Sequence, residues 1–259
     1  VFWADAADAP YTFNAASQTV SINYDGVTSN LENRDAFFAH EDDLLVNGTI
    51  NKTIQLKRPF AQLNIGATDY AAAETAAFKT ASSAVKVNHV ANALNIHTGD
   101  ATGDETTITF ADAAVPADTE RFPVDGVNAD YLAMNYLLVD DTKQLVDVEF
   151  TAKSTKGETI TRSYANVPVQ RNYRTNIYGN ILTEEANFNI VIVPGFENPD
   201  YNFKVVEVAT AADLATAVAA GGAVKLTADV ALPATLSIPA GKEVTIDLNG
   251  KTLKTTPEN

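Results

Sequence analysis

The chain has 259 residues, with 18 Lys and Arg against 33 Asp and Glu, a formal net charge of −15, 46% hydrophobic residues and no cysteine. This composition is typical of a globular protein of one or two domains with a full hydrophobic core. The absence of cysteine excludes disulfide scaffolds, zinc ribbons and cysteine nucleophiles. The acidic balance, with no Lys/Arg cluster, argues against nucleic acid and a bilayer surface as partners.

The N-terminal residues carry neither an export signal nor a membrane span. No run of about 18 apolar residues occurs, and the chain opens with Val1–Asp5 in place of a charged and then apolar leader. Val1–Asp5 has the pattern of a strand interior, so we expect further chain to precede it.

Residues 1–200 mostly alternate between apolar and polar side chains with a period of two, which is typical of strands with one face in a core. Short strands separated by turn signals such as Asp25-Gly26 favour an antiparallel β-sandwich. The predicted strands are Ser21–Tyr24, Thr53–Lys57, Ala61–Ile65, Val85–Val87, Thr107–Phe110, Val146–Phe150, Ile160–Tyr164 and Phe188–Ile192.

Two stretches have helical rather than strand periodicity. The alanine-rich Thr68–Ala84, with Thr68 as N-cap, predicts a helix that packs on the sandwich. Thr210–Asp213 resembles a capping box, and a short apolar stripe follows it before Gly221-Gly222, so a short capped helix is predicted there. The stripe comprises Leu214, Ala217 and Val218.

A domain boundary is predicted at Pro194–Asp200, which carries the Pro, Gly and Asn of a connection. Acids strongly outnumber bases before this segment and are nearly balanced by them after it. We therefore divide the chain into residues 1–200 and residues 201–259.

The second part has strands of a few residues at close spacing, which suits the coils of a parallel β-helix. About two coils fit, fewer than the three or so that a solenoid needs, so we expect the chain to be truncated at Asn259. The predicted strands are Val224–Leu226, Ala231-Leu232, Leu236–Ile238, Val244–Leu248 and Thr252-Leu253.

Four blocks in residues 1–200 resemble the fimbrillin-like proteins of Bacteroides and its relatives: Val1–Asp5, Asn33–Phe38, Lys57–Gly66 and Val167–Asn180. The resemblance implies transthyretin-like β-sandwich domains, a lipoprotein exported to the outer membrane, and assembly into type V pili by strand exchange. Most of a first sandwich and the lipid-anchor region are absent from this sequence, and an appended module follows the sandwich. These departures favour an accessory or tip subunit, or an unpolymerised adhesin, over a stalk subunit.

The segment Gly241–Leu253 separately resembles the first coil of right-handed parallel β-helix proteins, in which a short helix often caps the N-terminal end. Asn249-Gly250 within it is either the start of an asparagine ladder or a turn in left-handed conformation, and we favour the turn.

Candidate chemistry is sparse. Carboxylates for glycoside hydrolysis could lie in His40–Asp43 or Val139–Asp141, but adjacent residues on a strand point to opposite faces and loop neighbours are usually solvated. Gly99–Glu105 could bind calcium, but it lacks the EF-hand order of acidic residues, so solvated loops are the preferred interpretation for all three segments. His40, His89 and His97 lack the spacing of a zinc protease. We therefore expect no enzyme activity, no cofactor and no metal.

Two further features bear on binding. Arg171 and Arg174 flank Asn172-Tyr173 and suit a carboxylate or a sugar, although packing of an Arg stem on Tyr is the preferred interpretation. Phe188, Ile190 and Ile192 offer the alternate apolar side chains that strand addition requires, so they are the strand-exchange candidates. Because the chain continues past them into another module, an intramolecular strand is preferred.

The sequence thus predicts a non-enzymatic adhesin or accessory pilus subunit at the surface of a Gram-negative bacterium, with other subunits or host and bacterial surface ligands as partners. Membrane attachment is expected only through a lipid anchor on the missing N-terminus. The alternative is a polysaccharide-binding or polysaccharide-degrading surface protein whose active part lies in missing β-helix coils.

Overall fold

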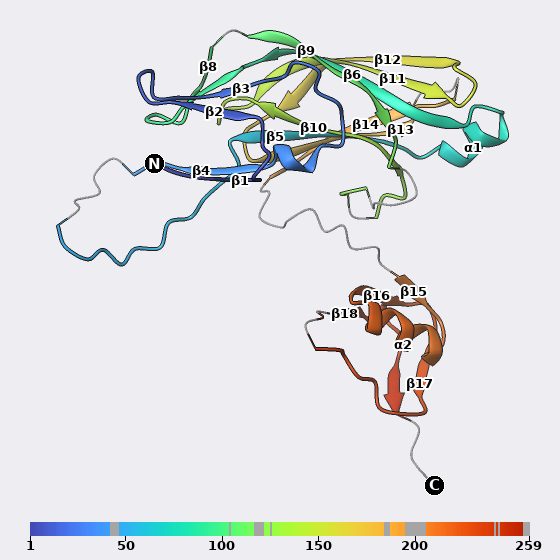
Figure 1. Ribbon diagram of the computed structural model, residues 1–259. Helices are drawn as coiled ribbons and strands as arrows, with labels where there is room; N and C mark the ends of the chain where they lie inside the picture. The colour runs from blue at the N-terminus through green and yellow to red at the C-terminus, as the bar shows by residue number, and fades with distance from the viewer. Residues whose placement is uncertain are drawn as a thin grey trace. The chain divides into compact units, whose positions relative to one another are not determined.

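The computed structural model describes residues 1–41, 47–103, 105–116, 122–124, 126–183, 187–194, 206–240, 242 and 244–255. These residues form two compact units, the first containing β1 to β14 and the second β15 to β19 with helix α2 (Figure 1). The predicted boundary segment lies outside the described residues beyond Pro194. None of the described helices is long and apolar enough to cross a membrane.

Two four-stranded sheets make up the body of the first unit (Figure 1). One has the order β10-β5-β13-β14, with bounds Asp130–Leu138, Phe60–Ala67, Tyr173–Asn180 and Asn187–Pro194. The other has the order β12-β11-β6-β9, with bounds Thr159–Val169, Gln144–Ser154, Thr80–Val90 and Thr106–Ala114. In these sheets β5 and β13 pair in parallel, and the other neighbours pair antiparallel.

The core of this unit lies between the two sheets. Leu63, Val87, Phe150 and Ile177, each from a different strand, are fully buried in it. The predicted mainly β fold is confirmed, and the two sheets share their core as a β-sandwich does.

A second apolar cluster covers the opposite face of the β5 sheet and includes Phe60, Tyr136 and Leu138. Its cover comes from short elements: the ribbon β1 (Phe2–Asp5) with β4 (Ala36–Ala39), the 3-10 turn Glu32–Arg34, and a sheet of β2 (Tyr11–Asn14), β3 (Thr19–Ile22), β7 (Ala93–Asn95) and β8 (Ala101–Thr102). Every residue of β5 is buried because the strand is covered on both faces.

Two of the predicted strands in this unit need correction. Thr53–Lys57 is not a strand and contributes only an isolated bridge between Lys57 and Phe38. β3 ends at Ile22, before the predicted Tyr24. The Tyr24 ring packs against both apolar clusters, and its hydroxyl accepts a hydrogen bond from the Leu138 N–H at 3.1 Å, so it does not continue the alternation.

The helix predicted over Thr68–Ala84 is much shorter, because α1 spans only Tyr70–Thr75. Its N-cap is Asp69 rather than Thr68, and the chain turns at Ala77 with a φ of 71°. From Thr80 onward the residues belong to β6, where hydrogen bonds to two neighbouring strands outweigh the helix propensity of alanine.

The second unit contains β15 (Val206–Val208), α2 (Ala211–Ala220), β16 (Gly222–Leu226), β17 (Val230–Leu232), β18 (Val244–Asp247) and β19 (Leu253–Thr255). The capped helix is confirmed: the Thr210 hydroxyl accepts the Asp213 N–H and donates to the Asp213 carboxylate, and Gly221 follows with a φ of 85°. Leu236–Ile238, predicted as a strand, is not one.

The strands of this unit pair in parallel, as β15-β16-β18 and as β17-β19. Val206 pairs with Val224, Gly222 with Val244 and Val230 with Leu253, so the three ladders have offsets of 18, 22 and 23 residues. Asn249 and Gly250 adopt φ values of 46° and 71°, as expected of a turn, and the Asn249 amide also donates to the Leu226 carbonyl at 3.1 Å.

Candidate functional site

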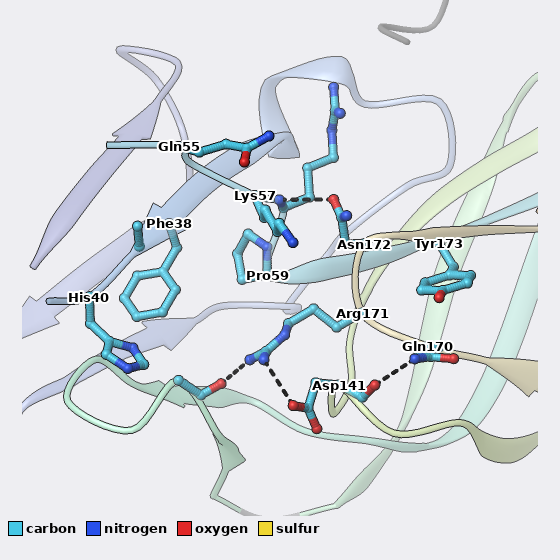
Figure 2. A pocket seen from close by; sticks show the side chains of 13 residues that line it. Phe38, His40, Gln55, Lys57, Pro59, Asp141, Gln170, Arg171, Asn172 and Tyr173 are labelled. Atoms are coloured by element: carbon cyan, nitrogen blue, oxygen red, sulfur yellow. Dashed lines mark hydrogen bonds and ion pairs between the residues drawn. The ribbon is translucent and has the colours of Figure 1, made fainter. Parts of the chain in front are cut away.

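A cleft of about 710 Å³ opens on the first unit, where five separate parts of the chain meet (Figure 2). It combines basic, amide and aromatic side chains with one acid. The lining residues are Phe38, Ala39, His40, Gln55, Lys57, Arg58, Pro59, Gly99, Asp141, Gln170, Arg171, Asn172 and Tyr173.

Backbone hydrogen bonds bring two sequence-distant walls of the cleft together. The Asn172 N–H donates to the Phe60 carbonyl at 2.8 Å, and the Asn172 side-chain oxygen accepts the Arg58 N–H at 3.2 Å. Asn172 adopts a φ of 64°, a conformation that Asn tolerates better than most residues. Next to this contact, Phe38 and Lys57 exchange backbone hydrogen bonds of 2.8 and 3.0 Å.

Arg171 is held in the middle of the cleft (Figure 2). Its backbone N–H donates to the Asp140 carbonyl at 2.9 Å, and its guanidinium donates to the Gly99 carbonyl. The guanidinium also lies 3.6 Å from the Asp141 carboxylate, which is 70% exposed. These partners direct the guanidinium toward Gly99 and Asp141, and packing of the Arg171 stem on Tyr173 stays a prediction.

Arg58 has a structural role at the edge of the cleft. Its guanidinium makes two hydrogen bonds of 2.7 Å to the two carboxylate oxygens of Asp35 and lies 4.5 Å from the centre of the Phe37 ring. A buried Arg paired in this bidentate way is neutralised in place. The charge that the cleft offers to a ligand therefore comes from Lys57 and Arg171.

The aromatic rings line opposite sides of the cleft in Figure 2, with Phe38 and His40 on one side and Tyr173 on the other. The Phe38 and His40 ring centres are 5.9 Å apart. Gln170 donates its amide to the Asp141 carbonyl at 2.6 Å, which fixes its position. Fixed cations, amides and ring faces suit an anionic ligand that also has hydroxyl groups and apolar surface.

The other predicted candidates do not converge on one site. Asp140 accepts the Ala101 N–H at 3.1 Å, whereas Asp141 faces Arg171, so the two carboxylates have different partners. Asp42, Asp43 and Asp104 lie outside the described residues. Glu105, the last residue of the proposed calcium segment, contacts the His89 ring at 3.2 Å.

The three histidines are also dispersed: His40 lines the cleft, His89 lies on β6, and His97 follows β7 with its N–H bonded to the Asn95 side chain at 2.9 Å. Within the described ranges, no three His, Asp or Glu side chains gather as metal ligands would.

The strand-exchange candidates Phe188, Ile190 and Ile192 lie on β14, which pairs antiparallel with β13 from Asn187 to Pro194. β14 forms the edge of its sheet. Ile190 packs against the sandwich core, while Phe188 is 41% exposed and its ring meets that of Tyr164 edge-on at 4.7 Å. The segment is thus an intramolecular edge strand in this structure, and strand exchange stays a prediction.

Sequence reasoning missed Lys57 and Gln55 as cleft residues and considered Arg171 only with Arg174. Arg174 lies on β13 opposite Gln62 of β5 and does not line the cleft. The sequence signal that could have located the cleft is the family resemblance of Lys57–Gly66 and Val167–Asn180, because residues of both blocks line adjacent walls of the cleft.

The chain belongs to a family of unknown function, DUF6562, whose model matches residues 1–225. No curated protein matches the sequence. Two similar solved structures are described as candidate cell adhesion proteins: that of Bacteroides uniformis has 13% identity and a TM-score of 0.35 over 73% of this chain and 74% of its own. That of Bacteroides ovatus has 14% identity and a TM-score of 0.31 over 54% of this chain and 45% of its own. A fimbrial protein of Bacteroides vulgatus has 12% identity and a TM-score of 0.30 over 73% of this chain and 72% of its own.

Proposed function

We propose that this chain is a non-enzymatic cell-surface adhesin or an accessory, tip-type pilus subunit, built on a transthyretin-like sandwich that carries the beginning of a parallel β-helix. Its partners are other pilus subunits or surface ligands of a host or another bacterium. A lipid anchor on a preceding segment attaches it to the outer membrane of a Gram-negative cell.

The observation that carries this proposal is the pairing of β5 with β13. These strands come from the two longest fimbrillin-like blocks, and they lie side by side in parallel from Arg174↔Gln62 to Gly179↔Ala67. Residues that resemble one family thus form the centre of one sheet, next to the edge strand β14. An edge strand with alternate apolar side chains is what strand addition between subunits uses.

The β-helix part of the proposal rests on the second unit. Two of its three parallel ladders repeat at offsets of 22 and 23 residues, which is a coil length that a solenoid can stack, and the first ladder has an offset of 18. The Thr252 N–H also donates to the Asp229 carboxylate at 2.8 Å. These residues are 23 positions apart, which is the offset between β17 and β19. A stacked solenoid of this kind suits ligand display rather than polymerisation.

A disulfide lock tests strand exchange directly. Tyr178 and Asn189 are partners across β13 and β14, and the chain has no other cysteine to interfere. Antiparallel partners lie about 4.5–5.5 Å apart at Cα, within the range that a disulfide spans. We expect oxidised Tyr178→Cys/Asn189→Cys to stay out of filaments sheared from cells and the reduced form to enter them.

The two single-cysteine variants are the matched controls, because each removes one native side chain without forming the lock. Equal incorporation of the oxidised and reduced double variant would show that β14 is never donated. That result would remove strand exchange through β14 as the assembly mechanism, whereas absence of both forms from filaments would leave the stand-alone adhesin.

The alternative is a surface protein that binds or degrades polysaccharide. The cleft favours the binding form of this alternative, because Arg171, Lys57 and the ring of Tyr173 line one cavity. Degradation requires two converging carboxylates, whereas Asp141 is the one carboxylate among the described lining residues.

A further inference from the structure

The cleft is a basic spot on a strongly acidic chain. With Arg58 paired to Asp35, two of its 13 lining residues, Lys57 and Arg171, offer positive charge against the one acid Asp141, whereas the whole chain has 18 Lys and Arg against 33 Asp and Glu. Such a local reversal of charge favours an anionic ligand at this place over the rest of the surface.

Lys57 supplies a positive charge that the fold does not use. Its backbone is fixed by the two hydrogen bonds to Phe38, while its ammonium is exposed and forms no ion pair among the described residues. Because both backbone groups of Lys57 are already bonded, this wall presents side chains to a ligand rather than an open strand edge.

Arg171 supplies a second, pre-positioned cation. Its guanidinium has five N–H donors, of which the Gly99 carbonyl takes one, and its ion pair with the exposed Asp141 is long at 3.6 Å. Gly99 adopts a φ of 80°, and a Cβ there would lie 3.3 Å from the Phe38 ring and 3.4 Å from the Arg171 guanidinium. Because Gly99 has no Cβ, its backbone, the Phe38 ring and the Arg171 guanidinium can lie close together.

The remaining walls suit a sugar ring. The half-buried ring of Tyr173 offers apolar surface beside the buried Phe38, and the amides of Gln55, Gln170 and Asn172 offer donors and acceptors for hydroxyl groups. A cavity of about 710 Å³ lies within the usual size of a small-molecule site, about 300–1,000 Å³.

We propose that this cleft binds a carboxylate-bearing saccharide, with Arg171 and Lys57 contacting the carboxylate and the amides and aromatic rings contacting the sugar. The proposal deepens the adhesin function, on which it rests for an extracellular glycan as the source of the ligand.

Isothermal titration of the 259-residue chain with digalacturonate tests this directly. The matched probe is the methyl ester of the same disaccharide, which keeps the sugar and removes the charge, and triglutamate tests a general acidic peptide. We expect digalacturonate to bind about tenfold or more tightly than its ester, because hydrogen bonds to charged groups are the stronger ones.

Lys57→Gln is expected to weaken digalacturonate binding by about fivefold or more and to leave binding of the ester unchanged. Arg171→Gln is expected to weaken it further. Lys86→Gln is the matched control, since Lys86 is an exposed lysine of β6 that does not line the cleft. Thermal unfolding of each variant separates loss of binding from loss of folding.

Equal affinity for acid and ester, equal affinity for triglutamate, or no binding of any probe at millimolar concentration would each overturn the proposal. If the cleft fails this test but the protein is found on adhering cells, the saccharide-binding proposal is lost and the adhesin function remains. Binding by a protein that is absent from the cell surface would instead overturn the adhesin function and leave the site.

Discussion

The carboxylate of Asp69 fastens the chain between β13 and β14. It is 6% exposed and accepts backbone N–H groups from Ile181 at 3.0 Å, Leu182 at 3.0 Å and Thr183 at 2.8 Å, as well as the Thr183 hydroxyl at 2.8 Å. Asp69 makes no side-chain hydrogen bond to its own helix α1, so this contact between distant segments is its main role.

Asp69→Ala leaves three backbone donors without their acceptor. Each buried donor that loses its partner costs about 1–3 kcal/mol, and water reaches the half-buried Thr183 more easily than the buried Ile181 and Leu182. We expect the free energy of unfolding to fall by about 3–5 kcal/mol in Asp69→Ala and by about 1–2 kcal/mol in Asp69→Asn, which keeps one acceptor oxygen.

Urea unfolding followed by Trp3 fluorescence measures this loss. Trp3 is the single tryptophan and lies in the first unit, with ring centres 5.4 Å from Tyr11 and 6.4 Å from Phe38. The control is Asp112→Ala, which removes an exposed carboxylate 3.8 Å from Lys153 and is expected to cost less than about 0.5 kcal/mol. A loss below about 1 kcal/mol in Asp69→Ala would refute the argument that buried donors depend on this carboxylate.

Three further changes test other parts of the structure. Gly66→Ala should lower the free energy of unfolding by about 1–3 kcal/mol, because a Cβ there would lie 2.6 Å from the Phe122 ring, and urea unfolding measures it. Thr210→Ala should destabilise α2 by about 1 kcal/mol through loss of the cap on the Asp213 N–H, as measured by amide exchange of the helix. Burial raises the pKa of Tyr24 to about 12, so stability should fall as the pH rises from about 10, where an unfolded tyrosine ionises, to about 12.

Each of these changes has its own control. Phe122→Leu should recover part of the Gly66→Ala loss, and no recovery would mean that the ring is not the obstacle. Thr216→Ala changes an exposed threonine within α2 and should have little effect; an equal loss would rule out capping as the cause. Burial also raises the pKa of Tyr11 and Tyr164, so Tyr24→Phe should lessen the alkaline decline without removing it, and an unchanged decline would assign it to those other groups.

The sequence was enough to predict features that depend on neighbouring residues. It was not enough to predict features that depend on contacts between distant segments. α2 was predicted at its observed position because Thr210 and Gly221 cap it through neighbouring residues. α1 was predicted too long. The helix propensity of alanine is a local property, and it does not reveal that the residues from Thr80 onward pair with distant strands in a sheet.

The same contrast separates the strands. β11 alternates because one of its faces is outside the core, whereas β10 is buried along nearly its whole length and has no alternation to detect. The cleft depends on Lys57 and Arg171, which meet only once β5 and β13 have paired, so no spacing rule could have joined them.

The most direct test of the adhesin proposal is the state of the protein on the native cell. Intact mass and N-terminal sequencing of material sheared from the cell surface, with electron microscopy of the same fraction, report its location, processing and assembly together. The account predicts recovery of the chain in the sheared fraction, in filaments with a processed N-terminus or as a lipid-anchored surface protein. Recovery only from the cell interior, with none in the sheared fraction, would contradict it.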